Sequence, residues 1–298
     1  MVELQNIATE QRNPRTMNID TLSTLDMVKL INQEDRQVAE AVGLVTDKIA
    51  AAVDVIADRL SQGGRLIYCG AGTSGRLGVL DAVECPPTYS TDPEMVQALM
   101  AGGYGAIFKA VEGAEDSKDL GVQDLQAIGF TSGDVLVGIA ASGRTPYVLG
   151  CMEYAKQLGA RTIAVTCCPG SQLDTFADIG IAPAPGPEVI TGSTRMKSGT
   201  AQKMVLNMLS TGAMIKLGKV YGNLMVDVKP SNEKLIRRCV TIVRAATACE
   251  EAAAVDALER CGYRPKAAIV MILCGVDAGK AQALLEQAGG RIAKVLEG

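Results

Sequence analysis

The sequence predicts an α/β protein with N-terminal helices, a doubly wound, mostly parallel sheet, and a small C-terminal helical domain. Three observations lead to this prediction. Apolar runs typical of buried strands alternate with helical patterns between residues 66 and 217, which favours a parallel sheet covered on both faces. Loops rich in glycine and hydroxyl groups lie where strands give way to helices, and from residue 232 onward only helical patterns remain.

The chain has 298 residues, of which 48% are hydrophobic, enough for one large α/β domain with a small companion. The change of pattern places the first domain at residues 1–230 and the second at 231–298. The net charge of −4, with only 3 Phe and no Trp, makes nucleic acid an unexpected partner. We expect a cytoplasmic protein that binds no membrane, because the N-terminus is polar and no run of about 18 apolar residues occurs.

Histidine is absent from the sequence, and the nine cysteines are scattered without metal-type spacing. These facts exclude a Ser-His-Asp triad, a Cys-His pair and histidine metal sites. Proton transfer must then come from another side chain or from the substrate, and carboxylates in a partly desolvated pocket are favoured. We expect neither a metal nor a cofactor.

Taken in order, apolar spacings of three and four predict helices over residues 22–31 and 38–60. A buried strand follows at 66–70, and the helix after it should stop at Pro86 and Pro87. Further strands are expected at 95–100, 135–141, 162–167 and 179–182. Further helices are expected at 106–112, 119–128 and 147–158, from the loop at 191–200 to about residue 217, and at 235–246, 250–261, 266–274 and 278–287.

The first strand runs into residues 70–76 (GAGTSGR). A glycine-rich turn at a helix N-terminus presents backbone N–H groups and the helix dipole to an anion. The glycines match the dinucleotide fingerprint, but the next strand does not end in the acid that would bind a ribose. The hydroxyls of Thr73 and Ser74 favour a compact phosphate instead, with a purely structural turn as the other alternative.

Two later strand-to-helix junctions, at residues 142–145 and 192–197, again combine glycine, hydroxyl donors and a basic residue. Each charge-assisted hydrogen bond to a phosphate contributes about 1.5–3 kcal/mol, so several converging loops could hold a sugar phosphate. Ordinary helix capping by Ser and Thr is the alternative interpretation. The candidate binding residues are Gly72, Thr73, Ser74, Ser142, Gly143, Arg144, Thr145 and Ser193.

Two glutamates are candidates for acid–base chemistry. Glu84 ends a predicted helix, where the dipole disfavours an acid, and Glu115 follows a glycine in a cluster with Glu112 and Asp116. Solvated surface is the alternative for both. The residues alone do not select this pair over Glu112 or Asp81.

Several motifs are long and specific. They are GAGTSGR (70–76), ECPPTY (84–89), VEGAED (111–116), IAASGRTPY (139–147), GSTRMK (192–197), GNLMVDV (222–228) and the early Thr9-Glu10. Together they closely resemble the motifs of the bacterial N-acetylmuramic acid 6-phosphate etherases. The similarity spans nearly the whole chain and is looser beyond residue 234.

The resemblance implies a sugar isomerase (SIS) fold and a homodimer. It implies cleavage of the D-lactyl ether of N-acetylmuramic acid 6-phosphate, giving N-acetylglucosamine 6-phosphate and D-lactate in cell-wall recycling. The family's acid and base fall on Glu84 and Glu115, respectively. Proton abstraction at C2, loss of lactate from C3 and addition of water would complete the reaction without metal or nicotinamide.

Two other functions stay open at this point. An aldose–ketose isomerase would use the same proton abstraction at C2. A catalytically silent phosphosugar sensor resembling glucokinase regulatory protein would bind without turnover, although the presence of both Glu84 and Glu115 argues against it.

Overall fold

The computed structural model describes residues 8–109, 111–228, 230 and 232–297, which form two compact units. Unit 1 takes in the chain up to Ala82 and Glu94–Ser210; unit 2 takes in Val83–Pro93 and the chain from Thr211 onward. The compact units thus divide the chain earlier than the domain boundary at residues 230 and 231, which stays a prediction.

Unit 1 is built on a five-stranded parallel sheet in the order β2-β1-β3-β4-β5. Gly70 pairs with Met100 on one side and Ile139 on the other, so three strands end level at the carboxyl edge. Successive strands are added in one direction from β1 to β2 and in the other direction from β3 to β5, so the order reverses between β1 and β3. Open α/β sheets bind their ligands at such a reversal, beyond the carboxyl ends of the strands. The strands are β1 (Leu66–Gly70), β2 (Val96–Met100), β3 (Val135–Ile139), β4 (Arg161–Val165) and β5 (Ile179–Ile181).

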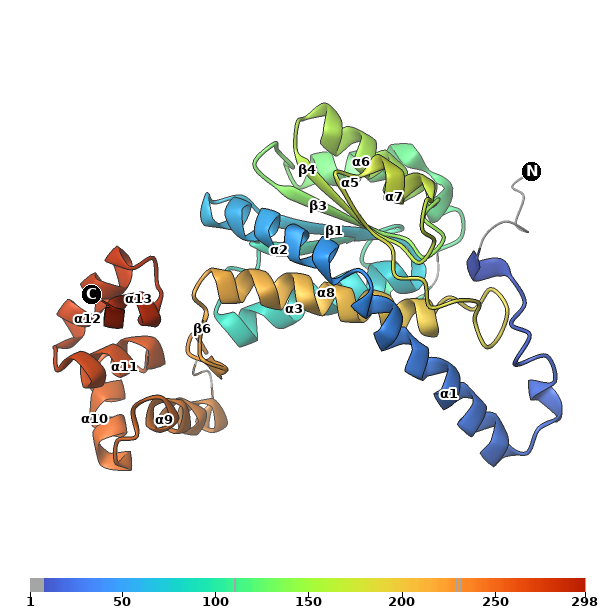
Figure 1. Cartoon of the computed structure of the whole chain (residues 1–298). Helices are drawn as coiled ribbons and strands as arrows, with labels where there is room; N and C mark the ends of the chain where they lie inside the picture. Colours follow the sequence, from blue (N-terminus) through green and yellow to red (C-terminus); the bar gives the residue numbers. More distant parts are fainter. Residues whose placement is uncertain (1–7, 110, 229, 231, 298) are drawn as a thin grey trace. The chain divides into compact units, whose positions relative to one another are not determined.

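Helices cover both faces of this sheet (Figure 1), as the sequence predicts. Alternate residues of a strand point to opposite faces. Ile67 and Cys69 therefore pack toward one helical layer, whereas the Tyr68 hydroxyl reaches Asp81 in the other layer. The first layer is α5 (Lys118–Ala127), α6 (Pro146–Gln157) and α7 (Gln172–Phe176); the second is α2 (Thr46–Ser61), α3 (Gly72–Tyr89) and α8 (Lys197–Lys216).

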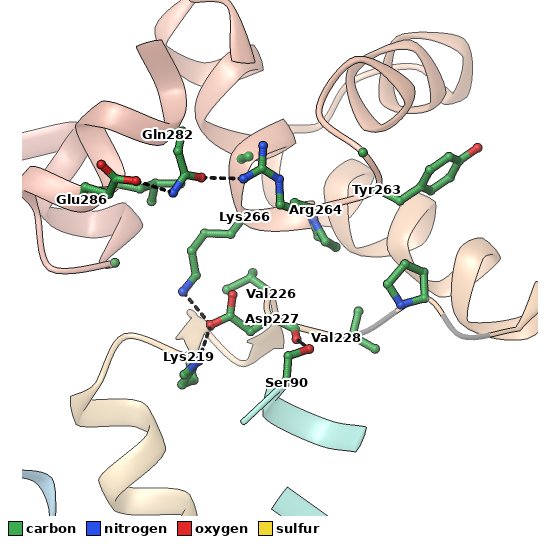
Figure 2. Close-up of a pocket in the computed structure, with 16 residues that line it drawn as sticks. Ser90, Lys219, Val226, Asp227, Val228, Tyr263, Arg264, Lys266, Gln282 and Glu286 are labelled. Atoms are coloured by element: carbon green, nitrogen blue, oxygen red, sulfur yellow. Dashed lines mark hydrogen bonds and ion pairs between the residues drawn. The ribbon is translucent and has the colours of Figure 1, made fainter. Parts of the chain in front are cut away.

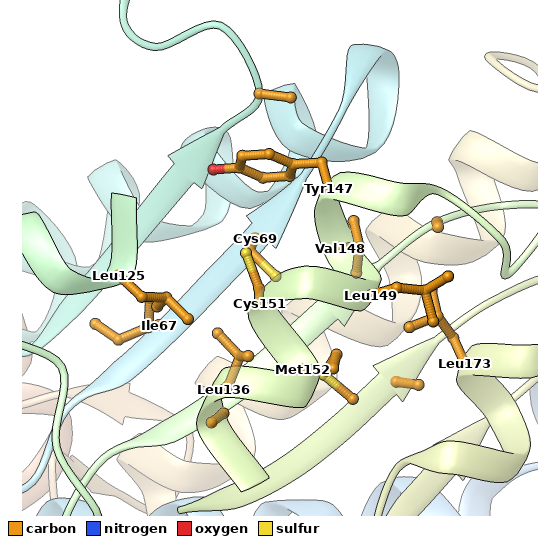
Figure 3. Close-up of a cluster of buried hydrophobic side chains, with 14 of the residues drawn as sticks. Ile67, Cys69, Leu125, Leu136, Tyr147, Val148, Leu149, Cys151, Met152 and Leu173 are labelled. Atoms are coloured by element: carbon orange, nitrogen blue, oxygen red, sulfur yellow. The ribbon is translucent and has the colours of Figure 1, made fainter. Parts of the chain in front are cut away.

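Apolar side chains of the first layer close over β1 and β3 (Figure 3). Leu125 of α5, Met152 of α6 and Leu136 of β3 are fully buried in this cluster. Burying an aliphatic side chain of this size contributes about 1.5–3 kcal/mol. The cluster holds α5 and α6 on the sheet, and with them the loops that precede both helices.

The N-terminal helices divide differently from the prediction. α1 (Thr24–Gly43) passes through the polar stretch at residues 32–37, and α2 begins only after Leu44 and Val45. Ser23 caps α1 by accepting a hydrogen bond from the Asp26 backbone at 3.2 Å. The predicted break was wrong because a polar stretch ends an apolar stripe without ending the helix that carries it.

α3 continues to Tyr89 through Pro86 and Pro87, so the predicted stop at the prolines was also wrong. Both prolines lie in the last turn, so the helix loses the two hydrogen bonds that their N–H groups would donate one turn back, but their carbonyls can still accept. The Pro86 carbonyl accepts from the Ser90 backbone N–H at 3.0 Å, and Ser90 itself has a positive φ of 49°. The helix therefore ends at a left-handed residue, not at the prolines.

Short elements account for most other differences. The helix predicted at 106–112 is confined to α4 (Gly105–Phe108), and residue 110 lies outside the described residues. Elements of two to six residues carry too little periodicity to predict. They are η2 (Ala8–Glu10), η3 (Ile19–Thr21), η4 (Ala114–Asp116), α7, β6 (Val220–Tyr221), β7 (Leu224–Met225) and α13 (Ile292–Glu297).

Unit 2 contains the β6–β7 hairpin and the helical C-terminal region that the sequence predicts. Its core includes Cys239, Val243, Leu258 and Ile269, all fully buried. Within the described residues, no single helix is long and apolar enough to cross a membrane; the helices Pro265–Cys274 and Ala278–Gln287, bent by 102°, pass that test only as a pair. The longer helices are α9 (Glu233–Thr247), α10 (Glu251–Arg260), α11 (Pro265–Cys274) and α12 (Ala278–Gln287).

An ion cluster joins the N-terminal segment to α1 and α8. The Glu34 carboxylate accepts hydrogen bonds from Arg15, from Lys197 Nζ at 2.9 Å and from Asn13 Nδ2 at 2.7 Å. The side chains of Glu34 and Lys197 are fully buried. These donors, Arg15 foremost, lower the pKa of Glu34 to about 2 and keep it charged at neutral pH.

We therefore expect acid to weaken the fold through Glu34. Its pKa in the folded chain is about 2 and its ordinary value is 4.5, so its stabilising contribution is complete above pH 4.5 and is lost as the pH falls toward 2. Urea unfolding of wild type and Glu34→Gln should differ most at neutral pH and converge below pH 4.5. The exposed Glu40→Gln on the same helix is the control, and a wild-type-to-Glu34→Gln difference that stays constant down to pH 2 would contradict the expectation.

Candidate functional site

Glycines bring the first turn of α3 directly onto the end of β1. A Cβ added at Gly70 would lie 2.7 Å from the Gly75 backbone nitrogen, and one added at Gly75 would lie 2.6 Å from the Gly70 carbonyl oxygen. Any larger residue would separate the strand from the helix. The glycines of GAGTSGR thus seat a helix N-terminus at the carboxyl edge of the sheet, the position expected for an anion.

A pocket of about 280 Å³ opens beside this turn. Gly72 and Arg76 line it from α3, and Glu112 and Glu115 line it from the segment before α5. Arg76 donates to the carbonyls of Ala106 and Ile107, both at 2.8 Å. This arginine therefore fixes the α4 wall of the pocket.

Local contacts on either side hold Glu115 in place. Gly113, with a φ of 76°, is the N-cap of the short helix η4, and the next residue, Ala114, is buried in the core that includes residues of α6. Ser117 caps α5 by accepting from the Leu120 backbone at 3.2 Å. Glu115 lies between these anchors with an exposed side chain that lines the pocket. Such a carboxylate can accept a proton from a ligand bound there.

The structure does not place Glu84 among the residues that line this pocket. Glu84 is exposed and belongs to the last turns of α3, which group with unit 2. Asp81, one turn earlier, is buried and accepts from Tyr68, Asn207 and Ser210. Burial raises the pKa of Asp81, and its hydrogen bonds join α3 to β1 and α8, so we assign it a structural role.

The second loop, at residues 142–145, leads from β3 into α6. Gly143 has a φ of 67°, and a Cβ there would lie 2.1 Å from Ser171 Oγ, so only glycine fits. Arg144 is exposed. Thr145 is the N-cap of α6, but its side chain makes no capping hydrogen bond, and Pro146 follows it. The N-terminus of α6 therefore keeps its capacity to bind an anion.

The third loop leads into α8, whose N-terminus already has a partner. The buried Glu188 carboxylate accepts from the backbone N–H groups of Lys197 and Ser198, each at 2.9 Å. Ser193 lies in the turn before this helix and is half-buried. The first N–H groups of α8 are occupied by Glu188, so a phosphate at this loop would bind the Ser193 hydroxyl instead.

The first and third junctions are in contact. Ser74 is buried and donates to Gln202 Oε1 of α8 at 2.9 Å. A Cβ added at Gly199 would lie 3.4 Å from Thr73 Cγ2. The structure thus brings Thr73 and Ser74 against the start of α8. The Ser74 hydroxyl already donates its hydrogen bond to Gln202, so it is not free to donate to a phosphate.

Sequence reasoning missed three polar groups beside these loops. Ser171 Oγ, Ser198 Oγ and Gln202 Nε2 are buried and have no hydrogen-bond partner among the described residues. Buried polar groups normally find a partner, and here water or a ligand would supply it. No motif marks these residues, because their position depends on the packing of α8 and the β4–α7 loop. Nor do the described residues include a group of three or more ligand-type side chains that could hold a metal ion.

Family models match three parts of the chain. The model for the SIS domain matches residues 121–212, and the model for the N-terminal SIS domain of glucokinase regulatory protein matches residues 48–156. The model for the C-terminal lid domain of that regulatory protein matches residues 222–276. The parallel sheet, the loops at its carboxyl edge and these matches define a SIS-domain protein.

Full-length relatives are more specific. An N-acetylmuramic acid 6-phosphate etherase of Photorhabdus laumondii is 60% identical over 291 residues, covering 98% of this chain and 97% of that protein. The Clostridium beijerinckii enzyme of that name is 56% identical over 296 residues, covering 99% and 97%. The chain belongs to the N-acetylmuramic acid 6-phosphate etherase family, as its motifs predict.

Solved structures of lower similarity also match. A phosphoheptose isomerase of Neisseria gonorrhoeae is 18% identical with a TM-score of 0.47, over 64% of this chain and 97% of that one. A phosphoheptose isomerase of Francisella tularensis is 20% identical with a TM-score of 0.46, over 65% and 98%.

Proposed function

We propose that this chain cleaves the D-lactyl ether of N-acetylmuramic acid 6-phosphate with water, giving N-acetylglucosamine 6-phosphate and D-lactate. The observation that carries the proposal is full-length identity of 60% to a named etherase, together with both motif glutamates. The reaction belongs to the recycling of cell-wall amino sugars, and we place it in the cytoplasm, as the sequence predicts.

The proposed chemistry begins with the open-chain sugar. Its C2–H is acidic because it lies next to the C1 aldehyde, and Glu115 removes this proton. Glu84 gives a proton to the lactyl oxygen as the C3–O bond breaks, and D-lactate leaves. Water then adds across the C2–C3 double bond, its hydroxyl going to C3 and a proton returning to C2, with the two carboxylates in reversed roles. Each positioned carboxylate accelerates the reaction by roughly 10²–10⁴-fold.

We propose that the loop at residues 142–145 supplies most of the phosphate binding. The N-terminus of α6 is not capped by Thr145, and Arg144 is exposed beside it. The other loops have prior partners: Ser74 donates to Gln202, and Glu188 occupies the start of α8. Gly72, Thr73, Ser74 and Ser193 would then contribute secondary contacts.

A homodimer remains part of the proposal. Leu80 and Val83 are large apolar residues of α3, one turn and one residue before Glu84. Their exposed fractions are 47% and 60%. Apolar side chains this exposed at neighbouring helix positions are typical of an interface. A second copy of the chain packed on this part of α3 would bury them and would also partly desolvate Glu84.

The test of the reaction is an isotope experiment. The purified protein is mixed with N-acetylmuramic acid 6-phosphate in heavy-oxygen water, and both products are analysed by mass spectrometry. Elimination followed by hydration places the label at C3 of the sugar and leaves D-lactate unlabelled. Label in the lactate instead, or release of no lactate at all, would overturn the proposal.

Replacing Ser142 with Ala should mainly weaken substrate binding. Loss of one hydroxyl donor to the phosphate costs about 1–3 kcal/mol, so KM should rise while the pH dependence of kcat stays unchanged. Steady-state kinetics across pH measures both quantities. Ser61→Ala, an exposed serine at the end of α2, is the control, and an unchanged KM in Ser142→Ala would remove that residue from the site.

A phosphosugar sensor is the second candidate, because the glucokinase regulatory protein models match residues 48–156 and 222–276. It predicts tight binding of the sugar phosphate without release of lactate. The same lactate assay therefore separates the two functions.

A further inference from the structure

One motif has no role in the proposed reaction. Residues 222–228 (GNLMVDV) form β7 and then place Asp227 in a pocket of unit 2 (Figure 2). The pocket has a volume of about 610 Å³, within the range of small-molecule sites. Its lining comes from the segment after the hairpin, from the turn between α10 and α11, and from α12.

Positive charge is in excess at the centre of this pocket. Asp227 Oδ2 lies 2.7 Å from Lys266 Nζ and 3.3 Å from Lys219 Nζ, so two ammonium groups share one carboxylate. The side chains of Lys266 and Lys219 are only 13% and 23% exposed. Burial lowers the pKa of Lys266 despite Asp227, which means that one carboxylate does not fully replace the lost hydration.

Spare hydrogen-bond capacity accompanies the charge. An ammonium group has three donors, and the acceptor that the described structure gives to both lysines is Asp227. The pocket's other charged groups are engaged: Arg264 donates to Gln282 at 2.8 Å, and Gln282 donates to Glu286 at 2.8 Å. The surplus charge and the free donors therefore belong to the lysine pair.

The N-terminus of α11 faces the same space. Arg264, Pro265, Lys266 and Ala267, the N-cap and first turn of this helix, all line the pocket. The N-cap side chain makes no capping hydrogen bond. Pro265 has no N–H, and the Lys266 backbone N–H donates to the Val226 carbonyl at 3.2 Å, so the helix contributes its dipole more than free donors. The helix dipole therefore adds to the field of the two lysines.

We propose that unit 2 contains an anion site of its own, which takes the phosphate group of a small phosphorylated metabolite between Lys219, Lys266 and the start of α11. A phosphate offers three terminal oxygens and up to two negative charges, so it can bridge both ammonium groups while Asp227 keeps its own contacts. A singly charged carboxylate balances less of the charge. The remaining volume of the pocket accommodates the organic part of the ligand.

Lysine reactivity tests the site in the full chain. Trace acylation with acetic anhydride, followed by peptide mass spectrometry, gives the reactivity of each lysine at constant ionic strength. Inorganic phosphate and glucose 6-phosphate should protect Lys219 and Lys266, and neither should protect Lys280, which is exposed on α12. D-lactate at the same concentration should protect none of them.

Three variants, with Lys280→Met as their control, separate a site from a structural ion pair. In Lys266→Met, half-protection of Lys219 should need at least about tenfold more phosphate, and Lys219→Met should do the same to Lys266 if the first variant does not fold. In Asp227→Asn, which removes the competing carboxylate, about tenfold less phosphate should suffice. Lys280→Met should behave as wild type. Equal reactivity in phosphate and in chloride, or protection by lactate alone, would overturn the proposal.

Discussion

Glu115→Gln should lower the rate of D-lactate release by about 10²–10⁴-fold. Glutamine keeps the size of the side chain that lines the pocket but cannot take a proton from C2. Binding of N-acetylglucosamine 6-phosphate, measured by calorimetry, should be unchanged. Exchange of the C2 hydrogen with deuterium from solvent should be lost together with turnover.

Glu112→Gln is the matched control, because Glu112 lines the same pocket. It should retain most of the activity, and Asp116→Asn should do so as well. If Glu112→Gln loses C2 exchange while Glu115→Gln keeps it, the two glutamates exchange roles and our assignment of the base is wrong.

Glu84→Gln should reduce lactate release by a similar factor of about 10²–10⁴, but at a different step. The lactyl oxygen would have to leave without a proton, whereas Glu115 would still abstract the proton at C2. Solvent deuterium should therefore appear at C2 of unreacted substrate in Glu84→Gln and not in Glu115→Gln. Nuclear magnetic resonance of the recovered sugar distinguishes these outcomes.

Glu233→Gln serves as the control for Glu84→Gln, since Glu233 is an exposed glutamate of unit 2 whose ion pair is on the surface. It should turn over substrate like wild type. A Glu84→Gln variant with near-normal lactate release would exclude Glu84 as the acid.

The centre of the sheet could be predicted because β1 and β3 are continuous, mostly apolar runs with glycines nearby. β1 and β3 are fully buried along their length, and such positions favour apolar residues or, as at Tyr68, a polar group with a buried partner. Their carboxyl ends then fix where the loops 72–76 and 142–145 must lie. The helix break within residues 22–60 and the continuation of α3 through Pro86 were not predictable, because they depend on contacts and turn geometry rather than on apolar spacing.

Roles within the candidate site were harder to predict, since they depend on partners distant in sequence. Ser74 donates to Gln202, which is 128 residues away, and Arg76 donates to carbonyls about 30 residues on. Both residues have the chemistry of phosphate ligands, yet the fold uses them to join elements. Only Gly72 and Glu115 of the predicted site residues line the pocket beside α3.

The carboxylate of Glu188 at the start of α8 has a consequence for substrate orientation. Because it occupies the backbone N–H groups of Lys197 and Ser198, a dianion approaching that helix end finds these donors already taken, whereas the start of α6 lacks such a cap. The donors at the carboxyl edge are therefore distributed unevenly, with more of them free at the start of α6 than at the start of α8. A sugar phosphate entering there would be turned with its phosphate toward residues 142–145 before any hydroxyl makes contact.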